Sequence, residues 1–201
     1  MNLLPNNQIE LYGLRNYLTE LIKLYKNKSL PNKILLSGQK GIGKCTLAYH
    51  LINFILSSNE EFPYDDKNFF INRENRSYKL IQNGSNINFA LVDVLLEKKS
   101  IDISQIRSLI SNLNKSSLSS KPRLVLIDNI EFLNINSINA LLKIIEEPNE
   151  GVFFILINKN KKILETLKSR CLNFKISLSH SMSLEVINKL LDENVYNIIN
   201  K

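Results

Sequence analysis

Residues 37–46 read Ser-Gly-Gln-Lys-Gly-Ile-Gly-Lys-Cys-Thr, with an apolar run at 34–36 before them and an amphipathic run at 47–52 after them. A strand, a glycine-rich loop and a helix in that order form the context of a phosphate-binding loop. Glycine permits backbone conformations that bring N–H groups close to phosphate oxygens, and the helix directs the positive end of its dipole at the same place. The candidate phosphate-binding residues are therefore Gly38, Gly41, Gly43 and Lys44.

The position after Lys44 departs from a working P-loop. A serine or threonine there ligates Mg²⁺ beside the β and γ phosphates, whereas this chain has Cys45, whose thiol is a poor ligand for a hard cation. Thr46 comes one residue later, which on a helix rotates its hydroxyl away by about 100°. Cys45 and Thr46 thus belong to a nucleotide site that is expected to bind ATP or ADP weakly and to be vestigial for hydrolysis.

The composition limits the class of protein. A chain of 201 residues that is 44% hydrophobic can bury one core, or one core and a small appendage. The net charge of +7 fits a nucleic-acid neighbour or a coding bias towards Lys, Asn and Ile, and both interpretations stay open. Cys45 and Cys171 are too few for a four-cysteine zinc module and favour a reducing cytoplasm. The first residues do not resemble a signal peptide, and no apolar run approaches membrane-spanning length.

Apolar runs and helical periodicity alternate along the chain. The expected helices are 14–25, 47–56, 77–83, 103–113, 135–146, 161–168 and 183–192, and the expected strands are 34–36, 89–94, 123–128, 152–157 and 172–176. This alternation predicts an α/β fold with a doubly wound parallel sheet, whose ligands bind at the carboxyl ends of the strands. Residues 59–75 are expected to form an exposed insertion, and 116–122 a polar, basic loop.

The strand at 124–128 has the pattern of a Walker B motif, whose terminal carboxylate, here Asp128, helps to hold Mg²⁺. The alternative for Asp128 is a helix cap or loop acid. Asn129 follows where a catalytic glutamate would polarise water, and an amide cannot act as a base. Glu131 is two residues further on and points elsewhere if the strand continues.

Three segments carry a family resemblance: Asn-Ala-Leu-Leu-Lys-Ile-Ile-Glu-Glu-Pro at 139–148, the apolar run at 153–157 and Ser-Arg-Cys at 169–171. They resemble the clamp-loader family of AAA+ proteins. Segments 30–38 and 41–49 are similar to the delta-prime branch of that family, from bacterial DNA polymerase III. The resemblance extends from about residue 11 to residue 176. It implies a P-loop AAA+ domain over 1–177 and the start of a helical lid over 178–201, with no collar domain.

The resemblance also implies roles for single residues. Arg170 would be an arginine finger that reaches the γ-phosphate of a neighbouring subunit's ATP, and a surface ion pair is the alternative. Asn158 is the candidate polar sensor at the end of a strand. Cys171 is expected to pack rather than to react, and His50 and His180 receive no chemical role. Relatives often bind zinc in an insertion equivalent to 57–88, which has no cysteine here, so no zinc is expected.

The sequence therefore predicts a delta-prime-like stator of the DNA polymerase III clamp loader, which supports ATP-dependent loading of the sliding clamp on primed DNA. Its expected partners are the gamma/tau motor subunits, the delta subunit and, through the complex, the sliding clamp and primer–template DNA. No cofactor is required and no membrane is involved. The alternatives are an active motor subunit of the same family, or a small-molecule P-loop kinase. Little or no ATP hydrolysis by the chain itself is expected.

Overall fold

The computed structural model describes residues 4–115, 120–159 and 161–199. Its helices are the 3₁₀ turns η1 (Pro5–Asn7) and η2 (Ile130–Phe132) and the α-helices α1 (Arg15–Lys26), α2 (Lys44–Ser57), α3 (Arg76–Gln82), α4 (Ile103–Leu113), α5 (Ile135–Glu146), α6 (Glu165–Lys168) and α7 (His180–Ile199). Its strands are β1 (Lys33–Ser37), β2 (Phe89–Val92), β3 (Arg123–Ile127), β4 (Val152–Asn158) and β5 (Leu172–Lys175).

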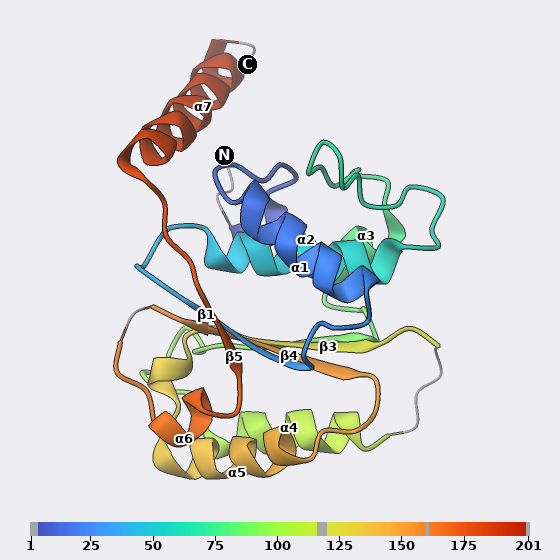
Figure 1. The fold of residues 1–201 in the computed structure, drawn as a ribbon, viewed down its shortest axis with the longest axis vertical. Helices are drawn as coiled ribbons and strands as arrows, with labels where there is room; N and C mark the ends of the chain where they lie inside the picture. The colour runs from blue at the N-terminus through green and yellow to red at the C-terminus, as the bar shows by residue number, and fades with distance from the viewer. Residues whose placement is uncertain (1–3, 116–119, 160, 200–201) are drawn as a thin grey trace.

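The five strands form one parallel sheet in the order β2-β3-β4-β1-β5. The sheet lies between two helical layers, with α1, α2 and α3 on one face and α4, α5 and α6 on the other (Figure 1). The predicted α/β fold with a parallel sheet is confirmed. In such a sheet all strands end at one edge, so the loops after β1, β2, β3 and β4 meet there.

The middle residues of the central strands are apolar because both faces of the sheet are covered. On β3, Leu124 and Leu126 pack towards the layer of α1 and α2, while Val125 and Ile127 pack towards α4 and α5. Successive side chains of a strand point to opposite faces, so a continuous apolar run fills two cores at once.

Side-chain caps set where the two helices of the lower layer begin. Asp102 caps α4, and the side chain of Gln105 reaches back to the Asp102 backbone N–H, which forms a capping box. Asn134 caps α5 by accepting a hydrogen bond from the Ser137 N–H at 2.9 Å.

The helix expected at 161–168 is shorter than predicted, because α6 begins only at Glu165. The Asn158 side chain explains the difference: its Nδ2 donates to the carbonyl of Lys161 and its Oδ1 accepts from the Lys161 N–H. These bonds fix the backbone of Lys161 to the end of β4, where a helix was expected to start. The last helix is longer than the predicted 183–192, since α7 covers His180–Ile199. Part of the loop expected at 116–122 lies outside the described residues.

The expectation that 59–75 form an exposed insertion is wrong for part of the segment. Tyr64, Ile71 and Asn75 are buried. The Tyr64 backbone N–H donates to Ser57 Oγ at 2.9 Å, and the Asn75 side chain caps α3. Two apolar side chains and one cap therefore fix this segment against α2 and α3.

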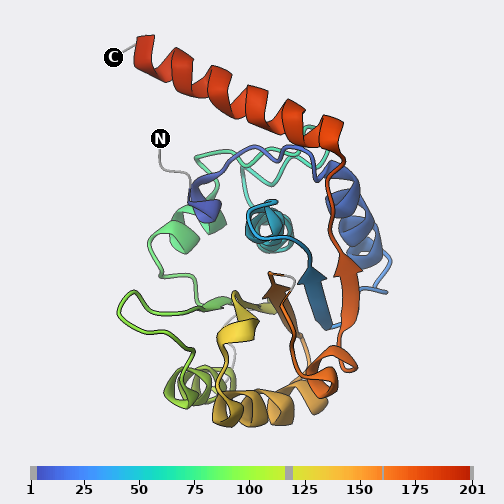
Figure 2. The same ribbon diagram turned by 90° about the vertical axis from the view of Figure 1, so that its left-hand side faces the viewer.

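The glycine-rich loop after β1 and the helix α6 lie at opposite ends of the sheet. The arrows of β1 and β5 point the same way, with α6 at their amino ends and α7 beyond their carboxyl ends (Figure 2). Among the described helices, none combines the length and the apolar character needed to cross a membrane.

Candidate nucleotide-phosphate site

The glycine-rich loop joins β1 to α2 in a conformation that requires glycine. Gly43, at the N-terminus of α2, has a φ of +90°, and Gly38 has a φ of +154°. A Cβ atom added to Gly38 would lie 2.3 Å from the backbone oxygen of Ile176, which follows β5. The loop and the end of β5 are thus in close backbone contact, and a side chain at position 38 would separate them.

Lys44 is buried at the first turn of α2, and the loop itself satisfies its ammonium group. Its Nζ donates to the carbonyls of Gly38 at 2.9 Å and Gln39 at 2.5 Å. Burial lowers the pKa of Lys44, and the nearby carboxylate of Asp128 partly opposes this effect. The ammonium therefore lies inside the loop, where a phosphate group would need it.

Cys45 and Asp128, at the Walker A and Walker B positions of the fold, lie close enough to influence each other's protonation. Burial raises the pKa of the Cys45 thiol strongly, and Asp128 adds to that effect, so the sulfur stays protonated at neutral pH. Burial also raises the pKa of Asp128, and the second carboxylate, Asp93, acts in the same direction. The two positions where a cation would be expected to bind thus hold a protonated thiol and a buried carboxylate.

The Asn129 side chain is hydrogen-bonded to Asp93. Its Nδ2 donates to Asp93 Oδ1 at 2.6 Å, and its backbone lies in the left-handed region with a φ of +58°. Asp93 follows β2 and Asn129 follows β3, so the parallel sheet brings them together. An amide in this position orients a carboxylate but cannot take a proton from water.

Glu131 was expected to point away from the site if the strand continued past Asp128, and that condition is not met. The strand does not continue: β3 ends at Ile127, Asn129 is left-handed, and the 3₁₀ turn η2 carries Glu131 back towards the loop. Its Oε2 accepts a long hydrogen bond from the Lys159 N–H at 3.4 Å, and its Oε1 is buried without a partner. Its charge acts on Lys44. Glu131 therefore belongs to the electrostatic environment of the site.

Lys159 and Asp93 are site residues that sequence reasoning missed. Lys159 follows β4, and its charge acts on Lys44, Cys45 and Asp128. The available signal was their position at the carboxyl ends of predicted strands, where ligands bind in a parallel sheet, although the expected strand at 89–94 included Asp93. Asn158, the sensor candidate, is buried at the end of β4, but both ends of its amide bind Lys161 as described above.

Thr46 faces a different space from Cys45. It lines a small cavity of about 120 Å³ together with Gly41, Gly43 and residues of α7 such as Val186. This cavity is smaller than the 300–1,000 Å³ typical of small-molecule sites. The rotation expected from helical geometry thus places the Thr46 hydroxyl away from Asp128.

Arg170 lies at the opposite end of the sheet from the loop, between α6 and β5. Its Nη2 is 2.6 Å from Glu146 Oε1, and its Nη1 donates to the Thr166 carbonyl at 2.8 Å. The side chain is 35% exposed. Because four residues of β5 span roughly 13 Å, Arg170 is too far away to contact a phosphate in its own loop.

The remaining candidates have structural surroundings. Cys171 is half-buried against the core beneath the sheet, and burial raises its pKa to about 11. His50 is fully buried, with Nδ1 2.8 Å from the Tyr64 hydroxyl and Nε2 3.2 Å from the Gln8 carbonyl. His180 is exposed at the start of α7. The described residues contain no group of three or more His, Cys, Asp or Glu side chains placed to hold a metal ion.

We expect ATP to bind this site weakly, with an affinity that Mg²⁺ changes by less than about tenfold, or 1.4 kcal/mol. The metal's expected ligand positions hold a thiol, which is a poor ligand for Mg²⁺, and a buried carboxylate. Calorimetry with and without Mg²⁺ measures the difference, and Cys45→Thr, which restores a hydroxyl, should increase the Mg²⁺ dependence. Tight binding by the unmodified chain that disappears on chelation would contradict this expectation.

Comparisons with known proteins agree on one family. The profile of the family described as "DNA polymerase III, delta subunit" matches residues 13–180. The gamma subunit of DNA polymerase III from Buchnera aphidicola of Schizaphis graminum is 29% identical over 82% of this chain and 40% of its own length. The delta' subunit of the same organism is 28% identical over 87% of this chain and 51% of its own length. This chain spans about half the length, or less, of these relatives.

Solved structures support the fold. A DNA polymerase III gamma subunit-related protein from Thermotoga maritima superposes with a TM-score of 0.55 and 21% identity, over 80% of this chain and 47% of that one. The Holliday junction branch migration motor RuvB of the same organism superposes with a TM-score of 0.50 and 16% identity, over 87% of this chain and 49% of that one. At these identities the likeness concerns the AAA+ fold alone.

Proposed function

The chain belongs to the DNA polymerase III, delta subunit, family, and from this premise we propose that it acts as a delta-prime-like stator of the clamp loader. In this role it presents Arg170 to an ATP-bearing neighbour and contributes little or no hydrolysis of its own. Residues 1–177 form its AAA+ module, and 178–201 begin a lid. Its partners are gamma/tau motor subunits and the delta subunit, and through them the sliding clamp and primer–template DNA.

One observation supports this proposal: the positions that would take part in hydrolysis hold side chains that cannot perform that chemistry. Cys45 carries a protonated thiol, and the Asn129 amide donates to Asp93. Phosphoryl transfer depends on a hydroxyl that binds the metal and a residue that positions water, and neither Cys45 nor Asn129 supplies these functions. A P-loop subunit of this kind supports the complex by position and not by turnover.

The position of Arg170 supports the same role. A guanidinium offers a planar set of donors that suits a phosphate, and the contacts with Glu146 and the Thr166 carbonyl hold this one at the surface in front of a strand. Because it lies at the end of the sheet opposite to the loop, a phosphate that it contacts belongs to another subunit.

Glu131 is the observation that favours the alternative, an active motor subunit. A carboxylate with one buried, unpartnered oxygen, close enough to influence Lys44, could position water in place of the residue at 129. The kinase alternative gains no comparable support from the site.

A steady-state ATPase assay separates the two roles. We expect negligible ATP turnover from the isolated chain. Cys45→Thr should not restore turnover, since the amide of Asn129 still cannot act as a base. Each 1.36 kcal/mol of lost transition-state stabilisation lowers the rate about tenfold. The chain should instead increase turnover when it is added to ATPase subunits of a clamp loader. Turnover near one per second that Lys44→Ala or Glu131→Gln abolishes would establish the motor role and refute the stator.

A further inference from the structure

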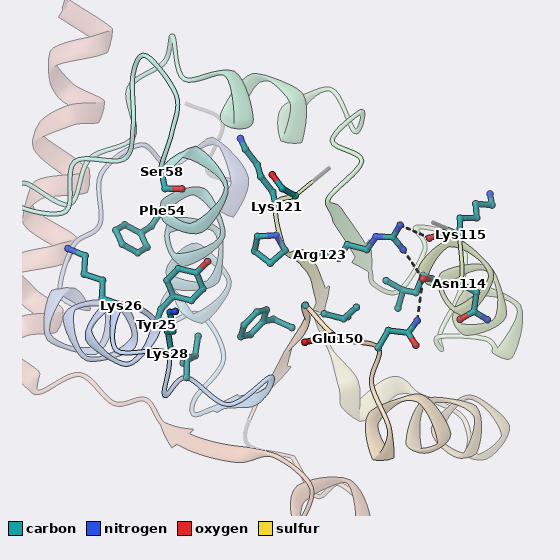
Figure 3. A pocket seen from close by; sticks show the side chains of 18 residues that line it. Tyr25, Lys26, Lys28, Phe54, Ser58, Asn114, Lys115, Lys121, Arg123 and Glu150 are labelled. Carbon is teal, nitrogen blue, oxygen red and sulfur yellow. Dashed lines mark hydrogen bonds between the residues drawn. The ribbon is translucent and has the colours of Figure 1, made fainter. Parts of the chain in front are cut away.

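A second cavity lies far from the P-loop, at the amino ends of β3 and β4, where Arg123 and Val152 begin their strands. It has a volume of about 940 Å³ and is open to solvent between α1 and the end of α4 (Figure 3). This is within the size range of sites that bind small molecules or the anchor side chains of peptides. The nucleotide chemistry discussed above takes place at the other edge of the sheet and does not use this cavity.

Three aromatic rings form one side of the cavity. The Tyr25 ring packs edge to face on Phe54, with centroids 6.2 Å apart, and on Phe153, with centroids 6.0 Å apart. All three rings are half-buried, so part of each faces the cavity. Such a surface binds apolar or aromatic groups, because rings contribute a large contact area and preferred edge-to-face contacts.

The charged side chains around this aromatic surface are nearly all basic, although several have partners. Lys26 pairs with Asp66 at 2.6 Å, Lys121 pairs with Glu60 at 2.8 Å, and the Arg123 guanidinium binds the last carbonyls of α4. Glu150 is the acidic residue among the described residues that line the cavity.

Two lysines carry positive charge without an acidic partner, and Glu150 carries one negative charge without a basic partner among the described side chains. Lys28 and Lys115 are exposed and have no acidic partner among the described side chains, and Lys115 Nζ binds only the neutral Asn112 Oδ1, at 3.1 Å. Figure 3 shows them on opposite sides of the cavity, with the aromatic rings on the side of Lys28. The site thus offers an apolar centre between two separated positive charges.

We propose that this cavity docks an acidic segment of a partner protein, with a large apolar or aromatic side chain in the cavity and carboxylates on both flanks next to Lys28 and Lys115. Charge complementarity selects the acidic flanks, and the ring cluster selects the anchor. A single nucleic-acid strand is less well matched, since strand binding uses an extended basic groove with several bases stacked in succession, whereas this cavity has one ring cluster.

The probe is a fluorescein-labelled eight-residue peptide in which a Leu-Phe pair is flanked by three acidic residues on each side, and its binding is measured by fluorescence anisotropy. Lys28→Glu should weaken binding about tenfold, because it replaces an attraction by a repulsion. Lys99→Glu, an equal charge change on an exposed residue outside the cavity, should have no effect beyond that of net charge. Thermal melting confirms that both variants are folded.

A second experiment tests whether the aromatic rings bind the apolar residues of the peptide. Replacing Leu-Phe by Ser-Ser in the peptide should weaken binding at least about thirtyfold, as removal of a buried anchor does. Tyr25→Phe should bind as the unmodified chain does, and Tyr25→Ala should not. Equal binding by the Leu-Phe and Ser-Ser peptides, or equal effects of Lys28→Glu and Lys99→Glu, would overturn the proposal. Tighter binding of an oligothymidylate that competes with the peptide would assign the cavity to nucleic acid instead.

Discussion

Arg170→Ala should slow ATP hydrolysis at a neighbouring motor site by about 10³-fold or more, as removal of arginine fingers does elsewhere. The free energy of unfolding of this chain should change by less than about 1 kcal/mol, because the Arg170–Glu146 pair is half-exposed and ion pairs in contact with solvent contribute little to stability. Turnover in the reconstituted complex measures the first effect and urea denaturation of the chain the second. Other motor sites continue to work, so the loss in total turnover is partial.

Two further substitutions separate the finger from a surface ion pair. Arg170→Lys should restore little activity, since an ammonium cannot make the two-pronged contact of a guanidinium. Glu146→Gln removes the charge of the pairing partner and leaves the arginine in place, so hydrolysis should persist. If Glu146→Gln and Arg170→Ala reduce turnover equally, the pair is structural and the proposed role of Arg170 is lost.

The second large effect concerns stability in acid. Burial lowers the pKa of His50 to about 4 from its ordinary value of 6.5. Its neutral ring donates from Nε2 to the Gln8 carbonyl and accepts at Nδ1 from the Tyr64 hydroxyl. Both ring nitrogens therefore have a hydrogen-bond partner in the neutral form, and protonation of Nδ1 would break the bond that it accepts. Between pH 6.5 and 4 the unfolded chain binds a proton that the folded chain does not, so stability falls as the pH falls through this window. The resulting loss in the free energy of unfolding that is due to His50 amounts to roughly 3 kcal/mol.

Urea denaturation at pH 7 and pH 4 measures this contribution. His50→Gln keeps a donor and an acceptor in the side chain but does not titrate, so its stability should depend less on pH than that of the unmodified chain. His180→Gln is the matched control, because His180 is exposed on α7. If the His50→Gln and unmodified chains lose stability in parallel, His50 is not the group responsible.

The fold was predictable because its signals are local and strong. The runs at 124–127 and 153–157 are apolar at every position, which only a strand covered on both faces can accommodate. The glycine spacing before α2 identified the loop, and the strand ends identified Asp128. These features depend on residues that are close together in the sequence.

The contacts of the site were less predictable because they depend on backbone geometry between elements. Glu131 faces the loop only because Asn129 adopts a left-handed conformation that ends the strand, and no residue type requires that conformation. The insertion at 59–75 appeared polar by composition, yet Tyr64 is buried through its bond to His50, a residue in a different element. A sequence pattern within one segment does not contain such pairings.

The hydrogen bonds of Lys44 to its own loop affect how tightly and how fast the loop binds a phosphate ligand. The carbonyls of Gly38 and Gln39 occupy two of the three N–H donors of the ammonium, so one donor remains for a phosphate oxygen. A phosphate that takes a second contact from Lys44 must displace one of these carbonyls. Its affinity is then the intrinsic affinity multiplied by the fraction of molecules in which that carbonyl has been released. Occupancy of the loop would depend on this equilibrium within the subunit as well as on the nucleotide concentration.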